Sequence, residues 1–206
     1  MRQYALEQHQ SGVGFIEVLI TLFVLAIGLL GVASLQFVGS FANRDAISRT
    51  QSELVAEQVA ERLRTAARPA TASDSMVVNN AYFTAENYNF ATLSCADDDV
   101  YACHCLSRPA SIPDCEGGNC SEAQMAQYDS WALSCAAVQT NQAVTLQVTC
   151  TDSIASDTDT CSSGSRIHII LSWPVSNSTK QKYTLNARCN ADAKDSNACV
   201  VKDITL

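Results

Sequence analysis

The run from Val13 to Ala33 constrains the fold of this chain more than any other feature, because it is apolar except for Glu17 and Thr21. A helix rises about 1.5 Å per residue, so ~20 residues of this kind cross a ~30 Å hydrocarbon layer. A secretory signal peptide fits less well, since its apolar region spans about 7–15 residues and ends in a small-residue cleavage site. No such site follows Ala33. We therefore expect a membrane-spanning helix.

Glu17 is unexpected in a plain membrane anchor. Placing a carboxylate deep in lipid costs roughly 2.5–3.5 kcal/mol or more on insertion scales, so the presence of Glu17 in this run indicates a functional role. The alternative is that Glu17 lies near the interface and extends to water. Gly28 and Gly31 in the same run permit close approach of helices or local loosening, although small residues are common in membrane helices in any case.

Helical spacing continues beyond Ala33 while polarity rises. The apolar positions of this second stretch are Ile47, Leu54, Val55, Val59, Leu63, Ala66 and Ala67. This spacing indicates an amphipathic helix. The pair Arg68-Pro69 ends it, because a residue before proline leaves the α region. We expect one helix over residues 14–68, whose second half packs on the following domain. The alternative is a coiled-coil dimer, which the short, alanine-rich stripe disfavours.

The remainder of the chain, residues 69–206, is acidic and rich in cysteine. The chain carries a net charge of −8 with a pI near 4.7, which argues against nucleic-acid binding and against docking on anionic lipid. All ten cysteines lie in the second half. They are Cys95, Cys103, Cys105, Cys115, Cys120, Cys135, Cys150, Cys161, Cys189 and Cys199. Disulfides persist outside the cytosol, so we expect an exported, disulfide-rich head.

The pattern of this head predicts an α+β fold. Residues 94–135 read mainly as disulfide-stapled loops, with a short helix around Glu122 to Ser134. Three strands are expected, at residues 143–149, 166–173 and 182–188. An antiparallel meander of three or more strands with one face on the long helix is the economical arrangement. We suggest disulfide pairs Cys150–Cys161 and Cys189–Cys199.

Several patterns in the head invite a chemical interpretation. His104 and its neighbouring cysteines resemble a zinc ligand set only loosely, because zinc modules use C-x₂₋₄-C pairs. The groups Asp97–Asp99 and Asp152–Asp159 do not follow the calcium-loop pattern. His168 lies in the middle of an expected strand, and neither G-x-S-x-G nor C-x-x-C occurs. We expect no metal, no cofactor and no enzymatic activity.

Residues 11–20, SGVGFIEVLI, resemble the N-terminus of type IV prepilins. In that family a prepilin peptidase cuts after a glycine that stands five residues before a glutamate. Counting back from Glu17 makes Gly12 the last residue of a leader over 1–12 and Val13 the first residue of the mature chain. The resemblance also implies N-methylation at Val13. The continuation VLAIGLLGVASLQ, residues 24–36, resembles the PilV-like minor pilins of type IV pili.

This resemblance implies a pilin-like architecture. Residues 13–36 become a transmembrane and filament-core helix, 37–68 its amphipathic half, and 69–206 a head that is first periplasmic and then extracellular. The family assigns its glutamate to subunit recognition, and here Glu17 of one subunit is expected to meet the Val13 amine of a neighbour. A C-terminal Cys189–Cys199 loop also resembles that of pilins.

The resemblance further implies a minor pilin that acts in initiating and modifying pilus assembly, and thereby in adhesion and twitching motility. The expected partners are the prepilin peptidase, other minor pilins, the major pilin, a large tip adhesin and inner-membrane lipid before assembly. No nucleic acid is expected. One alternative is a minor pseudopilin of a type II secretion system. Another is a membrane-anchored periplasmic enzyme or chaperone rich in disulfides, which needs converging catalytic groups that the sequence does not suggest.

Overall fold

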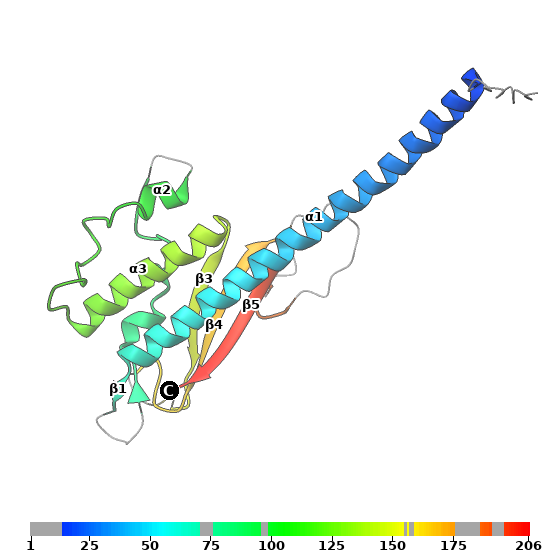
Figure 1. The fold of residues 1–206 in the computed structure, drawn as a ribbon. Coiled ribbons are helices and arrows are strands. Elements are labelled where there is room, and N and C mark those ends of the chain that lie inside the picture. The colour runs from blue at the N-terminus through cyan, green and yellow to red at the C-terminus, as the bar shows by residue number, and fades with distance from the viewer. Residues whose placement is uncertain are drawn as a thin grey trace, which may run out of the picture. The chain divides into compact units, whose positions relative to one another are not determined.

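The structure of the chain is a computed structural model that describes residues 14–70, 76–95, 99–154, 156, 159–175, 186–190 and 196–206. The chain forms two compact units, Met1–Ala46 and Ile47–Leu206. The order of the elements along the chain is shown in Figure 1. The leader over residues 1–12 and Val13, both assigned from the sequence, lie outside the described residues.

Helix α1, Phe15–Ala66, is 52 residues long and runs through both units. It begins after Gly14, whose carbonyl accepts a hydrogen bond from the Glu17 backbone N–H at 2.9 Å. It ends before the Arg68-Pro69 pair, as the restriction on residues before proline predicts. The expectation of a single continuous helix is therefore confirmed, and its bounds are Phe15–Ala66 rather than the expected 14–68.

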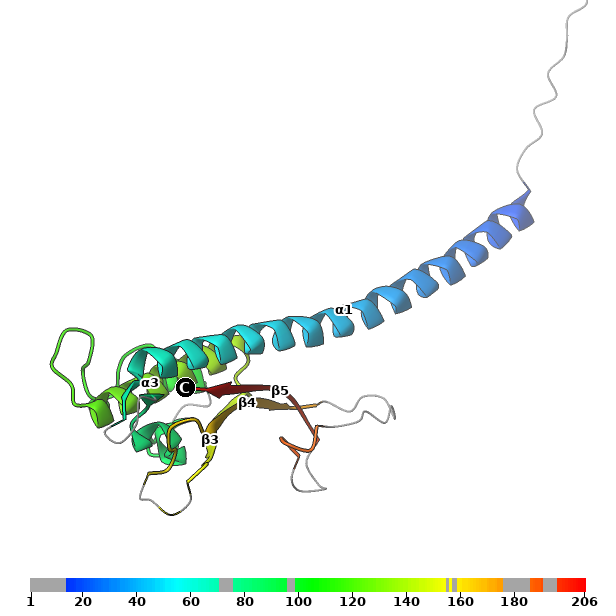
Figure 2. The same ribbon diagram turned by 90° about the horizontal axis from the view of Figure 1, so that it is seen from below.

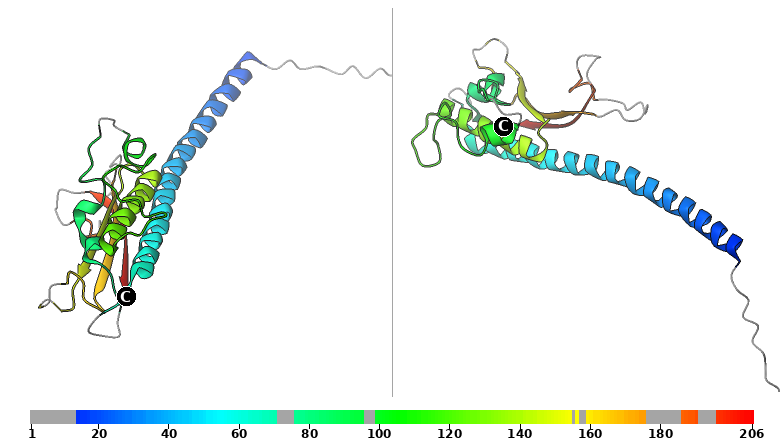
Figure 3. Two further views of the ribbon diagram at one scale, coloured as in Figure 1. Left: turned by 90° about the vertical axis from the view of Figure 1, so that its left-hand side faces the viewer. Right: turned by 90° about the horizontal axis from the view of Figure 1, so that it is seen from above.

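The second unit is built on a three-stranded antiparallel sheet of order β3-β4-β5, with β3 at Thr145–Thr151, β4 at Arg166–Pro174 and β5 at Asn197–Thr205. One face packs against the second half of α1 and against α3, Glu122–Thr140 (Figures 2 and 3). The buried cluster between these layers includes Val59, Leu63, Leu146, Ile169, Leu171 and Trp173. The fold is thus α+β, with the long helix on an antiparallel sheet.

The third strand was expected at residues 182–188, and this expectation is wrong in its described part. Residues 186–188 form no strand, Lys182–Leu185 lie outside the described residues, and the third strand is β5. The alternation of β5 is hard to recognise because it includes Lys202 and Asp203. Both charges have partners in the fold, since Lys202 pairs with Glu57 and Asp203 with Arg188.

Helix α3 extends further than expected, to Thr140 rather than Ser134. A capping box starts it: the Ser121 hydroxyl accepts from the Gln124 backbone N–H, and the Gln124 side chain accepts from the Ser121 N–H. In the described residues of the loop region before it lies the short helix α2, Val100–His104. Between α1 and α2 lie the two-residue strands β1, Arg68–Pro69, and β2, Met76–Val77, and the 3₁₀ turns η1, Asn80–Phe83, and η2, Ala85–Asn87.

All ten cysteines form disulfides. The pairs are Cys95–Cys103, Cys105–Cys135, Cys115–Cys120, Cys150–Cys161 and Cys189–Cys199. The last two are the pairs suggested from the sequence. Three of the five bridges lie within residues 95–135, and one of them, Cys105–Cys135, links the loop after α2 to the second half of α3.

Candidate functional site

The first part of α1 exposes an unusually apolar surface. Every side chain from Phe15 to Ser40 is exposed, with Phe15 at 81%, Phe23 at 68% and Leu35 at 75%. The helix contains an 18-residue window with a mean hydropathy of 2.7, none of it buried. Burying one large apolar side chain stabilises by roughly 1.5–3 kcal/mol, so this surface needs lipid or other helices around it. The segment is long and apolar enough to cross a membrane or to serve as a signal sequence.

Two polar side chains, Glu17 and Thr21, interrupt the apolar run between Phe15 and Ala33, and they differ in whether they find a hydrogen-bond partner within the helix. The Thr21 hydroxyl donates to the Val18 carbonyl at 2.9 Å, so it is paired within the helix. Glu17 is exposed in the first turn, and its carboxylate makes no hydrogen bond or ion pair with any residue that the structure describes. The positive end of the helix dipole favours a carboxylate at this position. A full partner has to come from elsewhere.

The neighbouring residues assigned from the sequence fit this picture only in part. Gly12 and Val13, the expected processing site, lie outside the described residues. Gly28 and Gly31 lie in the exposed stretch, and a Cβ added at either position meets no atom within 4 Å. Because neither glycine has a side chain and no described atom lies over it, another helix can approach the α1 backbone closely at both positions.

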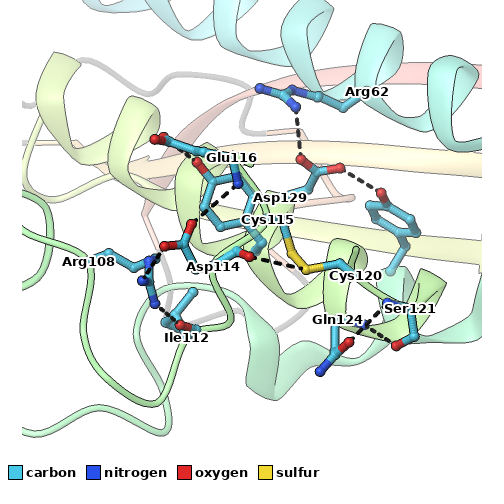
Figure 4. The surroundings of a disulfide bond; sticks show 12 residues. Arg62, Arg108, Ile112, Asp114, Cys115, Glu116, Cys120, Ser121, Gln124 and Asp129 are labelled. Carbon is cyan, nitrogen blue, oxygen red and sulfur yellow. Dashed lines mark hydrogen bonds and ion pairs between the residues drawn. A yellow bond between two sulfur atoms is a disulfide. The ribbon is translucent and has the colours of Figure 1, made fainter. Parts of the chain in front are cut away.

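A buried polar network in the second unit was missed by the sequence analysis. Asp129 of α3 is only 3% exposed and accepts from Arg62 Nη1 at 3.0 Å and from the Tyr82 hydroxyl at 2.6 Å. Figure 4 shows Arg62 reaching Asp129 from α1. Burial, followed by the hydrogen bond to Asp129, raises the pKa of Tyr82. The network ties α1, η1 and α3 together.

The only sequence signal for Asp129 is its position. It falls on the inward side of α3, at helical spacing from the buried residues Ala126 and Leu133. An aspartate in an apolar stripe indicates a satisfied buried charge, but its partners, Arg62 and Tyr82, lie 67 and 47 residues away in the chain. Such contacts follow only from the three-dimensional packing.

His168 belongs to a second polar cluster, on the sheet face opposite the core. Its Nδ1 lies 2.8 Å from Asp203 Oδ1, and its Nε2 lies 2.8 Å from Thr151 Oγ1. Arg188 Nη1 donates to both Asp203 oxygens, at 2.8 and 3.0 Å. The Arg188 guanidinium, followed by His168, lowers the pKa of the Asp203 carboxyl. The cluster fastens the segment 186–190 to β4 and β5.

The residues that suggested metal binding are placed in structural roles. His104 is buried, stacks on Phe90 with ring centroids 4.7 Å apart, and accepts at its carbonyl from Trp131 Nε1 at 2.9 Å. The cysteines near it are all in disulfides. Asp152 accepts from the Ser162 N–H at 2.8 Å and from the Ser165 hydroxyl at 3.0 Å, and so closes a turn. Asp97, Asp98 and Asp157 lie outside the described residues.

Comparison with known proteins finds no family model, no curated protein and no solved structure that matches this chain. The architecture itself is pilin-like: a long N-terminal helix, apolar and exposed in its first part, whose second part packs on an antiparallel sheet. The candidate functional site is the exposed apolar part of α1 together with Glu17, whose carboxylate has no partner in the described part of the chain.

Proposed function

We propose that this chain is a minor pilin of a type IV pilus, similar to PilV. One observation carries the proposal: Glu17, five residues after Gly12, lies in the first turn of an exposed apolar helix, and its carboxylate pairs with none of the residues that the structure describes. A plain anchor gains nothing from such a charge, whereas an assembling subunit uses it to select its neighbour.

The proposed mechanism starts with removal of the leader. A prepilin peptidase cuts between Gly12 and Val13, and Val13 then carries a new, N-methylated α-amine one helical turn from Glu17. In a bundle of such helices, Glu17 of one subunit pairs with the Val13 amine of the next. Opposite charges ~4 Å apart attract by about 4 kcal/mol at an effective dielectric constant near 20. Each charge is satisfied only in the assembled bundle, which fixes the register of the subunits.

The head completes the proposed role. Before assembly the chain sits in the inner membrane with its head in the periplasm, and it then moves into an extracellular pilus. Five disulfides suit a domain that must persist outside the cell. The proposed partners are other minor pilins, the major pilin and a large tip adhesin. Through them the chain promotes fibre growth, adhesion and twitching motility.

Replacing the charge at Glu17 tests this proposal. Glu17→Ala and Glu17→Gln chains should still be processed, because neither change alters Gly12, but their amount in the sheared pilus fraction should fall at least tenfold relative to the membrane fraction. That factor corresponds to about 1.4 kcal/mol, well within the strength of the pair. Glu53→Ala is the matched control, since Glu53 is an exposed α1 carboxylate of the second unit. Wild-type incorporation of both Glu17 variants would contradict the proposal.

A further inference from the structure

Strands β3 and β5 form the two edges of the sheet, and in each of them the N–H and C=O groups of every second residue point away from the central strand β4. In an antiparallel pair, every second residue directs its N–H and C=O toward the neighbouring strand and the residues between direct theirs outward. The Val175 N–H donates to the Ser196 carbonyl at 2.8 Å, next to the paired Pro174 and Asn197. The backbone groups of the even-numbered β5 residues therefore face β4, and those of the odd-numbered β5 residues face outward.

An asparagine side chain occupies the outward groups at one end of each edge. On β5, the Asn197 N–H donates to Asn190 Oδ1 at 2.7 Å and Asn190 Nδ2 donates to the Asn197 carbonyl at 2.9 Å. On β3, the Leu146 N–H donates to Asn89 Oδ1 at 2.8 Å and Asn89 Nδ2 donates to the Leu146 carbonyl at 2.8 Å. Each amide imitates the contact of a further strand and closes the edge at that point.

Past Asn197, no side chain of the described residues closes the outer edge of β5 in this way. Val201, Asp203 and Thr205 direct their backbone groups outward, and no strand of the described chain lies beside them. Val201 is half-buried, and Asp203 and Thr205 are exposed. An unprotected edge of this kind is a template for a further strand, and proteins usually block it.

The side chains of this edge define the chemistry that fits it. Lys202 is paired with Glu57, and Asp203 with Arg188, so both charges of the strand are already neutralised. Neither of these two β5 charges is therefore left free to pair with a charged side chain in an added strand, whereas an uncharged side chain needs no such partner. The edge thus favours a short, extended, uncharged segment that pairs through its backbone.

We propose that the β5 edge from Val201 to Thr205 binds an extended, uncharged segment of a different polypeptide as a fourth strand of the sheet. The choice of a different polypeptide rests on the proposed function. Two copies related by a two-fold axis would pair their β5 edges antiparallel and so run their head helices in opposite directions. Both copies have to enter the same membrane from the Ile47 end, which excludes that pairing.

Proline at the outward positions provides a selective block. A proline removes the backbone N–H, and it is tolerated on an edge strand where that N–H faces solvent. The Val201→Pro/Thr205→Pro chain therefore keeps the β4–β5 ladder but loses two outward donors. The matched control is Val201→Ala/Thr205→Ala, which shortens the same side chains and keeps both donors.

The test measures amide hydrogen exchange in the full chain in detergent micelles, with and without millimolar acetyl-Thr-Val-Thr-Val-Thr-amide. The peptide should slow exchange at Asp203 at least tenfold in the wild type and in the alanine control, and not in the proline chain. Exchange at Val200 and Lys202, which face β4, should stay unchanged and report an intact sheet.

No slowing in the wild type, or equal slowing in the proline chain, would overturn the proposal. Protection that appears without peptide and grows with protein concentration would identify a second copy as the occupant and would also overturn it. The readout does not involve the N-terminus, so failure here is distinct from failure of Gly12–Val13 processing or of the role of Glu17.

Discussion

Asp129 and Glu122 are two carboxylates of α3 that each pair with an arginine, yet their surroundings differ. Asp129 is 4% exposed at its side chain and meets Arg62, whereas Glu122 is 50% exposed and meets Arg68 at 2.7 Å. Exposed pairs contribute ~0–1 kcal/mol because water screens them. A buried carboxylate that holds two donors contributes more, since its loss leaves those donors without partners.

We predict that Asp129→Ala lowers the free energy of unfolding by about 2–3 kcal/mol, because the Tyr82 hydroxyl is buried and loses its acceptor. Glu122→Ala should lower it by less than about 1 kcal/mol. The measurement is guanidinium denaturation of the detergent-solubilised chain with disulfides intact, followed by the fluorescence of Trp131 and Trp173. Equal effects of the two substitutions would show that burial of Asp129 does not govern its contribution.

Asp152 is expected to make the stability of the fold depend on pH in the acid range. Hydrogen bonds from Ser162, side chain first and backbone next, lower the pKa of Asp152 to about 2 from 3.8. Because the folded pKa is lowered, the contribution of Asp152 is fully present above pH 3.8 and is lost as the pH falls toward 2. A carboxyl-carbon NMR titration should give a midpoint for Asp152 near 2. A midpoint at or above 3.8 would contradict the hydrogen-bonded turn.

At the scale of the elements, Asn89 closes the edge of β3 from an unusual backbone conformation. Its φ is 52°, in the left-handed region that asparagine tolerates better than most residues. The conformation is held by two side-chain hydrogen bonds to Leu146 and by a bond from its own N–H to the Ser134 hydroxyl at 3.0 Å. Asn89, in the turn after η2, therefore joins α3 and β3 at one point.

Two substitutions separate the hydrogen bonds of Asn89 from its conformation. Asn89→Gly keeps the backbone angle accessible and should lower the unfolding free energy by about 1–2 kcal/mol through the lost bonds. Asn89→Ala should lower it by a further ~1 kcal/mol, because alanine is strained at positive φ. Denaturation midpoints of the three chains give the order, which should be wild type, Gly, Ala. An alanine variant more stable than the glycine variant would refute this assignment.

The elements that could be predicted from sequence are those with a continuous period. The apolar spacing through Leu63 and the stop at Pro69 gave the extent of α1, and the alternation of Val148 with Thr149 gave β3. β5 was misplaced because its alternation includes Lys202 and Asp203, whose partners come from α1 and from the loop before β5. The sequence pattern within one segment predicts the secondary structure of that segment. It does not predict contacts between segments that are distant in the chain.

The same limit applies to the candidate site. Glu17 was identified from sequence because a single carboxylate in an apolar run stands out against its neighbours. For Asp129 the local signal is limited to its place on the buried side of α3, and the partners that complete its network, Arg62 and Tyr82, follow only from the three-dimensional packing.

At the scale of the whole molecule, the chain combines an exposed apolar helix segment with a second unit that is cross-linked by five disulfides. The exposed apolar stretch of α1 needs lipid or protein around it. The second unit has its own buried core and five disulfides. The passage from a membrane into an extracellular fibre that we propose for this chain requires both properties.

The most direct test of this account is the N-terminus of the protein after co-expression with a prepilin peptidase, read by mass spectrometry beside a Gly12→Ala chain. The account predicts a product that begins at N-methylated Val13, and an uncut Gly12→Ala chain that still begins at Met1. A wild-type product that keeps Met1, or that begins after Ala33, would contradict the pilin assignment and leave α1 as an ordinary anchor or a cleaved signal.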